Sequence, residues 1–164
     1  SFFWNERLNR TVNVLSVRDS ILSLRRILYS LQNLKQEEAL CWLQLAKHAR
    51  SHKQFSHANT SLVYAERIGE HLSESYIKWQ TFVEKVQLTY NQGEIYQSLQ
   101  KAEKVLSDHV GRIPSQLLSK MNVLAADWMN ETNAYEQSVI VERYRRAKHL
   151  QPKHEEPYFK FATF

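Results

Sequence analysis

The stretch that decides the fold is residues 39–65, which read ALCWLQLAKHARSHKQFSHANTSLVYA. Its first half places Trp42 three residues before the pair Leu45-Ala46, and its second half repeats small and apolar residues at three- and four-residue spacings. This spacing places side chains on one face of an α-helix. Because the polar interval 51–54 separates the two halves, the stretch predicts two short helices that pack together as a hairpin.

The hairpin has the layout of a tetratricopeptide repeat, a unit of about 34 residues in which small side chains lie where two helices approach closely. The positions that match are Trp42, Leu45, Ala46, Ala58, Leu62 and Ala65. We expect Trp42 and Leu62 to fill the space between the helices. Ala102 marks a less regular second unit, and Trp128 a later helix. The sequence thus predicts repeat cores near residues 37–69 and 74–108.

The rest of the chain has the same periodicity. Asp19 or Ser20 is expected to cap a helix that ends near Asn33, with Arg25 and Arg26 turned away from the core. Its predicted apolar stripe is Ile21, Leu24, Ile27, Leu28 and Leu31. Further helices are predicted over residues 55–69, 76–90, 95–106, 117–128 and 139–147.

Only three glycines and three prolines occur in 164 residues, so the chain offers few tight turns for a sheet protein. The predicted fold is all-α, a right-handed solenoid of antiparallel helix hairpins. Both ends look cut, so we interpret residues 1–164 as a single helical-repeat segment of a larger protein.

Charge and cysteine content narrow the class further. The formal charge of +5 permits an acidic or nucleic-acid partner, but 17 acidic residues are interspersed with 22 basic ones. The single cysteine, Cys41, excludes an intrachain disulfide and lies in an apolar pattern. Without a membrane-length apolar run or a signal peptide, the sequence predicts a soluble intracellular protein with no membrane partner.

A search for catalytic and metal sites assigns no residue to either. Glycines only at positions 69, 93 and 111 cannot form a phosphate-binding loop, so no cofactor site is expected in this segment. His48 and His52 have the spacing of a helical metal pair, and His57 follows nearby. We interpret all three as solvated histidines at helix ends.

The densest basic run is a weak candidate for contact with phosphate or an acidic partner. It comprises Arg143, Arg145, Arg146 and Lys148, followed by His149. Because Ile140, Tyr144 and Ala147 form a core stripe between these residues, an ordinary solvated helix face is the favoured interpretation.

Four motifs together carry a family resemblance. Residues 39–50 resemble a W-L-Q-x-A-x-x-A-R helix, and residues 128–133 a [FW]-M-x-E-T-x-N element that is followed by Tyr144, Pro152 and Tyr158-Phe159. The segments 4–8 and 19–26 resemble the W-x-x-R-L and R-R elements of the same family. The chain resembles the FAT region of the phosphatidylinositol 3-kinase-related protein kinases, and most of all their ATR-type branch.

The resemblance implies a structural and regulatory solenoid of a nuclear serine/threonine protein kinase in DNA-damage and replication-stress checkpoint signalling. It implies that the kinase domain, with its ATP and magnesium, lies outside this segment. The implied partners are that kinase domain, the neighbouring solenoid, a protein of the ATR-interacting type and a second copy in a homodimer. Direct contact with DNA is not expected.

Two alternatives stay open. A stand-alone tetratricopeptide adaptor would bind a peptide through exposed basic or asparagine side chains, for which Lys47 and Arg50 are the candidates in the best repeat. Alternatively, the face from Arg143 to His149 would bind nucleic acid with salt-dependent affinity.

Overall fold

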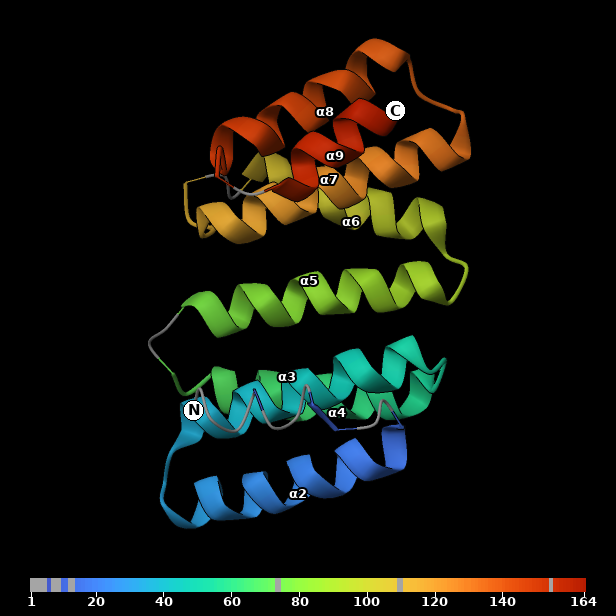
Figure 1. Cartoon of the computed structure of the whole chain (residues 1–164). Helices are drawn as coiled ribbons and strands as arrows, with labels where there is room; N and C mark the ends of the chain where they lie inside the picture. Colours follow the sequence, from blue (N-terminus) through green and yellow to red (C-terminus); the bar gives the residue numbers. More distant parts are fainter. Residues whose placement is uncertain (1–5, 7–9, 12–13, 73–74, 109–110, 154) are drawn as a thin grey trace. The chain divides into compact units, whose positions relative to one another are not determined.

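The computed structural model describes residues 6, 10–11, 14–72, 75–108, 111–153 and 155–164. Within these residues every regular element is a helix, which confirms the all-α prediction (Figure 1). The chain divides into two compact units, Ser1–Asn91 and Gln92–Phe164. The second predicted repeat core, residues 74–108, spans the boundary between them. No helix in the described part is both long enough and apolar enough to cross a membrane.

The first unit is built around a central hairpin. Its helices are α2 (Leu15–Leu31), α3 (Lys35–Ser51), α4 (Phe55–Gly69) and α5 (Ser75–Asn91). Helix α3 packs most extensively against α4 and also contacts α2 and α5, while α5 packs on α4 as well. Each helix thus packs on its neighbours in sequence, as expected for stacked helix hairpins (Figure 1).

Three-residue connections reverse the chain around this hairpin. Asn33 and Lys53 adopt left-handed backbone conformations, with φ of 55° and 60°. The N–H of Leu34 donates to the carbonyl of Tyr29 at 2.8 Å, and that of Gln54 to Ala49 at 2.9 Å. These i to i−5 bonds are those of the Schellman motif, which satisfies the last helical carbonyls. One turn geometry therefore ends both α2 and α3.

Small side chains bring α3 and α4 together. The core cluster between them consists of Ala39, Leu43, Ala46, Ala49, Ala58, Leu62 and Ala65, extended by Ile77 and Leu88. Leu45 belongs to a second cluster with Leu22 and Cys41. Apart from Trp42, every predicted core position of this hairpin is buried. Trp42 is partly buried and packs against both clusters.

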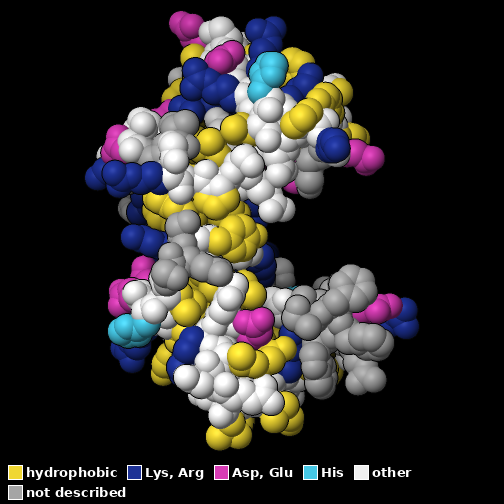
Figure 2. Space-filling view, turned by 90° about the vertical axis from the view of Figure 1, so that its left-hand side faces the viewer, with side chains coloured by type: hydrophobic (Ala, Val, Ile, Leu, Met, Phe, Trp, Pro, Cys, Tyr) yellow, Lys and Arg dark blue, Asp and Glu magenta, His cyan; other side chains and the backbone are white. Residues whose placement is uncertain are grey.

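The predicted face of the first helix is wrong. Helix α2 begins at Leu15 rather than near Asp19, and Arg25 is only 4% exposed whereas Leu31 is 79% exposed. The face that packs on α3 carries Leu15, Ile21, Leu22, Arg25 and Tyr29. The aliphatic side chains of Leu24, Ile27, Leu28 and Leu31 are exposed, and Figure 2 shows hydrophobic side chains at its lower edge, where α2 lies. Periodicity gave the helix but not which of its two apolar stripes meets α3.

The second unit comprises α6 (Ile95–Asp108), α7 (Ser115–Thr132), α8 (Gln137–Leu150) and α9 (Glu155–Thr163). Helix α7 packs on α6, α8 and α9, and α9 also packs on α8. Ala102 and Trp128 are buried as predicted. The Tyr144 hydroxyl donates to Asp127 at 2.6 Å, and Lys160 lies 2.9 Å from the other oxygen of that carboxylate. This chain of polar contacts joins α7, α8 and α9.

Candidate functional site

A buried carboxylate ties the hairpin to the helix that follows it. Glu84 of α5 is 1% exposed, and its Oε2 accepts a hydrogen bond from Arg50 Nη2 at 3.2 Å. Lys47 Nζ lies 3.8 Å from the other oxygen, and Arg50 Nη1 also donates to Asn91 Oδ1 at 3.3 Å. Because a buried charge is stable only when it is paired, this cluster fixes α5 on α3.

The Glu84 cluster changes the interpretation of Lys47 and Arg50. A peptide-binding adaptor needs such side chains free to face a ligand, whereas both are held by a carboxylate of their own chain. The basic side chains expected of a peptide-binding adaptor are therefore explained in this repeat by their ion pairs with Glu84. In the sequence, Glu84 is marked only as an acidic residue between Val83 and Val86. The tertiary structure alone shows that it meets the end of α3.

Trp42 links three helices through its ring. The Arg26 guanidinium carbon of α2 lies 3.6 Å from the Trp42 ring centroid, and the Tyr64 ring of α4 stacks on it at 4.5 Å and 15°. Arg26 is therefore not turned away as predicted. Burial lowers the pKa of Arg26, while Asp19 and other neighbours oppose that shift. The contacts are those of a cation–π pair and a stacked aromatic pair, which stabilise the packing of α2 and α4 on α3.

His48 and His52, which have the spacing of a metal pair, lie in different environments at the end of α3. His48 is partly buried, and Arg18 Nη1 lies 3.2 Å from each of its ring nitrogens. Burial lowers the pKa of His48, and the positive charge of Arg18 lowers it further. His52 is exposed, as expected, and its Nδ1 lies 2.8 Å from the carbonyl oxygen of His48. No group of three metal-ligating side chains occurs among the described residues.

The basic run of α8 is dispersed over several environments. Arg143 pairs with Glu103 of α6 at 3.7 Å, and Arg146 with Glu142 at 2.9 Å. The ammonium group of Lys148 lies over the rings of Tyr158 and Phe161 in α9, at 4.6 and 5.1 Å from their centroids. Arg145 is exposed. The solvated-face interpretation holds for Arg145 and Arg146 but not for Arg143 and Lys148, which make contacts with other helices.

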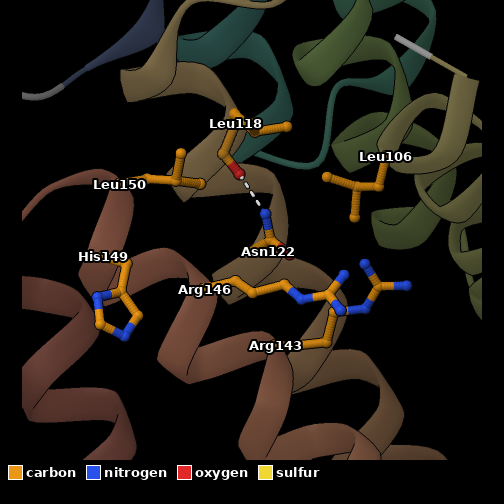
Figure 3. Close-up of a pocket in the computed structure, with 7 residues that line it drawn as sticks. All are labelled: Leu106, Leu118, Asn122, Arg143, Arg146, His149 and Leu150. Atoms are coloured by element: carbon orange, nitrogen blue, oxygen red, sulfur yellow. Dashed lines mark hydrogen bonds between the residues drawn. The ribbon is translucent and has the colours of Figure 1, made fainter. Parts of the chain in front are cut away.

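Arg143 and Arg146 also line a pocket that the sequence did not reveal. The pocket has a volume of about 360 Å³ and lies between α6, α7 and α8, lined by Leu106, Leu118, Asn122, Arg143, Arg146, His149 and Leu150. Figure 3 shows Leu118 and Leu150 on one side, the two guanidinium groups on another, and Asn122 between them. Its walls thus combine aliphatic and cationic side chains from three helices.

Burial lowers the pKa of Arg143, and the positive charge of Arg146 lowers it further, whereas Glu103 and Glu142 raise it. Asn122, on α7, donates through Nδ2 to the carbonyl of Leu118 at 2.8 Å, the dashed line in Figure 3. Arg143 and Asn122 are therefore partly desolvated, whereas Arg146 and His149 are exposed. Nothing in the periodicity of 115–132 distinguishes Asn122 from a solvated helix residue, so this position could not be found from sequence.

The motifs that carried the resemblance mostly lie on these structural elements. Trp42 through Arg50 form most of α3, Trp128 is in the core of the second unit, and Tyr144 is buried in α8. Trp4 and Arg7 of the first motif lie outside the described residues. The chain packs its helices into tight hairpins and joins them by polar contacts, and its described residues contain no metal cluster. These are the features of a domain with a structural role.

Comparison with known families identifies that class. The model of the FAT domain matches residues 2–164, and the chain belongs to this family. It is similar to "Serine/threonine-protein kinase ATR" of Oryza sativa subsp. indica and of subsp. japonica, with 24% identity over 181 residues in each. The alignments cover 98% of this chain and 7% of either relative. The expected resemblance to the ATR-type branch is thereby confirmed. No solved structure matches the chain.

Proposed function

We propose that this chain is a structural and regulatory solenoid segment of an ATR-like serine/threonine protein kinase that acts in nuclear DNA-damage and replication-stress checkpoint signalling. The observation that carries the proposal is similarity to ATR kinases along 98% of the chain, together with the family match. Since the chain spans only 7% of the length of those relatives, the kinase domain and its ATP and magnesium belong elsewhere in the longer protein.

The packing supports a supporting and transmitting role for the segment. Glu84 holds α5 on α3, and Trp42 contacts both α2 and α4, so a displacement of one helix is passed to the next. In stacked repeats each helix contacts mainly its neighbours, and small rotations accumulate along the array. Such an array suits the support of a kinase domain, contact with a partner of the ATR-interacting type, and contacts in a homodimer.

The proposal is tested on the full-length protein that contains this segment. Purified full-length protein is expected to phosphorylate a serine-containing peptide with ATP and Mg²⁺, whereas the 164-residue chain transfers no phosphate. Trp128→Ala in the full-length protein is expected to lower kcat while the KM for ATP stays unchanged, because the segment supports the kinase without touching ATP. A full-length protein without phosphotransfer activity would overturn the assignment.

The checkpoint role is tested in cells from which the protein has been depleted. Re-expressed wild-type protein is expected to be nuclear and to restore arrest under replication stress, and the Trp128→Ala variant at equal abundance to restore less. Normal arrest in depleted cells would contradict the checkpoint role and leave the kinase assignment standing.

A further inference from the structure

The pocket of the second unit combines an aliphatic wall, a polar rim and a buried side-chain amide. Leu106, Leu118 and Leu150 supply an aliphatic wall, and Arg143, Arg146 and His149 supply a polar rim. Its volume of about 360 Å³ is at the lower end of the range of ligand pockets, roughly 300–1,000 Å³. A pocket of this size accepts one anchoring side chain and the backbone on either side of it.

Asn122, one of the residues that line the pocket, carries a buried hydrogen-bond acceptor. Its side chain is buried, with 3% of the residue exposed, and no described residue donates to its Oδ1. The orientation of the amide is set by the bond to the Leu118 carbonyl, because only the NH₂ group can donate to that oxygen. A buried acceptor without a donor costs free energy. The pocket is therefore complementary to a ligand that brings an N–H group.

The rim is complementary to negative charge. The Arg146–Glu142 pair is solvent-exposed, with 60% and 50% of the side chains accessible, and such pairs contribute little stability. Arg143 lies 3.7 Å from its carboxylate partner, longer than a close charge-assisted hydrogen bond. Both guanidinium groups thus have donors for a further carboxylate. Helix α8 carries Arg143, Arg145, Arg146 and Lys148 against one acid, Glu142.

We infer that this pocket is a docking site for an acidic peptide segment of a protein partner. The segment inserts one aliphatic or aromatic side chain against the leucine wall and donates a backbone N–H to Asn122 Oδ1. Its flanking carboxylates pair with Arg143 and Arg146. The inference stands on the pocket itself and does not depend on the kinase assignment.

A peptide fits these features better than a nucleic acid does. No Phe, Tyr or Trp side chain lines the pocket, so a base finds none of the large rings on which bases usually stack. Glu103 and Glu142 lie beside the two arginines and would repel evenly spaced phosphates, whereas a peptide can place its charges selectively. The aliphatic wall also has no role in the contact of a phosphate backbone.

The test uses fluorescence anisotropy with the purified 164-residue chain and labelled dodecapeptides that carry three acidic residues, at varied positions among serine and glycine, around one central anchor, which is leucine, isoleucine, phenylalanine or tryptophan. At low ionic strength we expect at least one anchored peptide to bind with a Kd of about 1–100 μM, because the cost of ordering a flexible peptide offsets much of the favourable contact. Its partner with alanine at the centre is expected to bind at least tenfold more weakly, and added salt to weaken binding.

The matched variants are two arginines of the same helix. Arg146→Met removes one charge from the rim and is expected to weaken binding about tenfold, as the loss of a charge-assisted hydrogen bond does. Arg145→Met removes the same charge from an exposed position outside the pocket lining and is expected to change affinity less than about twofold. Asn122→Leu removes the acceptor and keeps the branching and the number of heavy atoms of the side chain, and it is expected to weaken binding about fivefold or more.

Four results would overturn the proposal. The first is an equal loss of affinity in the two arginine variants, and the second is an affinity that does not depend on the anchor. The third is the absence of binding by every anchored peptide at about 1 mM. The fourth is tighter binding of a twelve-nucleotide oligothymidine than of any peptide. Helical circular dichroism of each variant, matched to that of the wild type, accompanies every comparison.

Discussion

The two compact units bury their polar groups in different ways. In the first unit, the buried carboxylate of Glu84 is paired with Arg50 and Lys47, and alanines fill the interface of α3 and α4. In the second unit, larger side chains such as Met121, Trp128 and Tyr144 fill the core. There Asn122 lies beside a cavity of about 360 Å³ with a buried acceptor that has no described donor, as Gln80 Oε1 also does in the first unit. Both units thus leave a cavity between their helices, of about 200 Å³ in the first and about 360 Å³ in the second, but the helices of the first also close on a charge cluster.

The largest expected effect contrasts the two tryptophans. Trp128 is buried in the second unit, so Trp128→Ala should lower the free energy of unfolding by about 3–5 kcal/mol. Trp42 keeps part of its ring in solvent, so Trp42→Ala should cost less, about 1–3 kcal/mol. Urea denaturation followed by circular dichroism measures both. A larger loss for Trp42 than for Trp128 would show that the Arg26 and Tyr64 contacts outweigh burial.

Removal of the buried carboxylate is expected to have the next largest effect. Glu84→Ala leaves Arg50 and Lys47 without their partner and should destabilise the chain by about 2–3 kcal/mol. The control is Glu66→Ala, which removes the exposed ion pair with Lys85 and should cost less than about 0.5 kcal/mol. Chemical denaturation of the two variants side by side measures the loss of unfolding free energy in each. Equal losses would mean that Glu84 adds nothing beyond a surface ion pair.

A smaller effect is expected where the helices end. Lys53 has a φ of 60°, a conformation that glycine adopts without strain, so Lys53→Gly should raise stability by about 0.5–1 kcal/mol. Asn133, at the end of α7 in the second unit, has a φ of 51°, but asparagine tolerates this region better. Asn133→Gly should therefore gain less than Lys53→Gly in thermal unfolding. A loss of stability for Lys53→Gly would contradict the left-handed turn.

The smallest expected effect is a pH dependence of the first unit. Burial and Arg18 lower the pKa of His48, so the unfolded chain takes up a proton at higher pH than the folded chain does. Stability should therefore fall as the pH drops through the ordinary histidine pKa of about 6.5. In His48→Gln this slope should be smaller than in the wild-type chain. Identical slopes in the two proteins would contradict the shift.

Much of the fold was predictable because helical periodicity is local. The helix of residues 55–69 was predicted with the bounds of α4, and the small residues Ala46, Ala58 and Ala65 marked the tight interface. The first helix was predicted with the wrong face. It carries two apolar stripes, and the one with more aliphatic residues is exposed while Arg25 is buried. Which stripe is buried depends on the side chains that α3 presents. The sequence of the first helix alone does not contain that information.

The candidate site was less predictable for the same reason. The sequence singled out Arg143, Arg145, Arg146 and Lys148 as one run, but rotation about the helix axis sends them to different neighbours. Asn122 and Leu106 gave no signal, because they become pocket residues only when α6, α7 and α8 pack together.

The sequence by itself determined the helices, their alanine-rich contact and the FAT family, since each depends on residues that are close along the chain. The tertiary structure alone decided the face that α2 buries, the pairing of Glu84 with the end of α3, and the pocket around Asn122. Those features require side chains from different helices, such as Arg50 and Glu84, which are 34 positions apart in the first unit, and the lining residues of three helices in the second. Their energies depend on burial and distance, which exist only once the helices have packed.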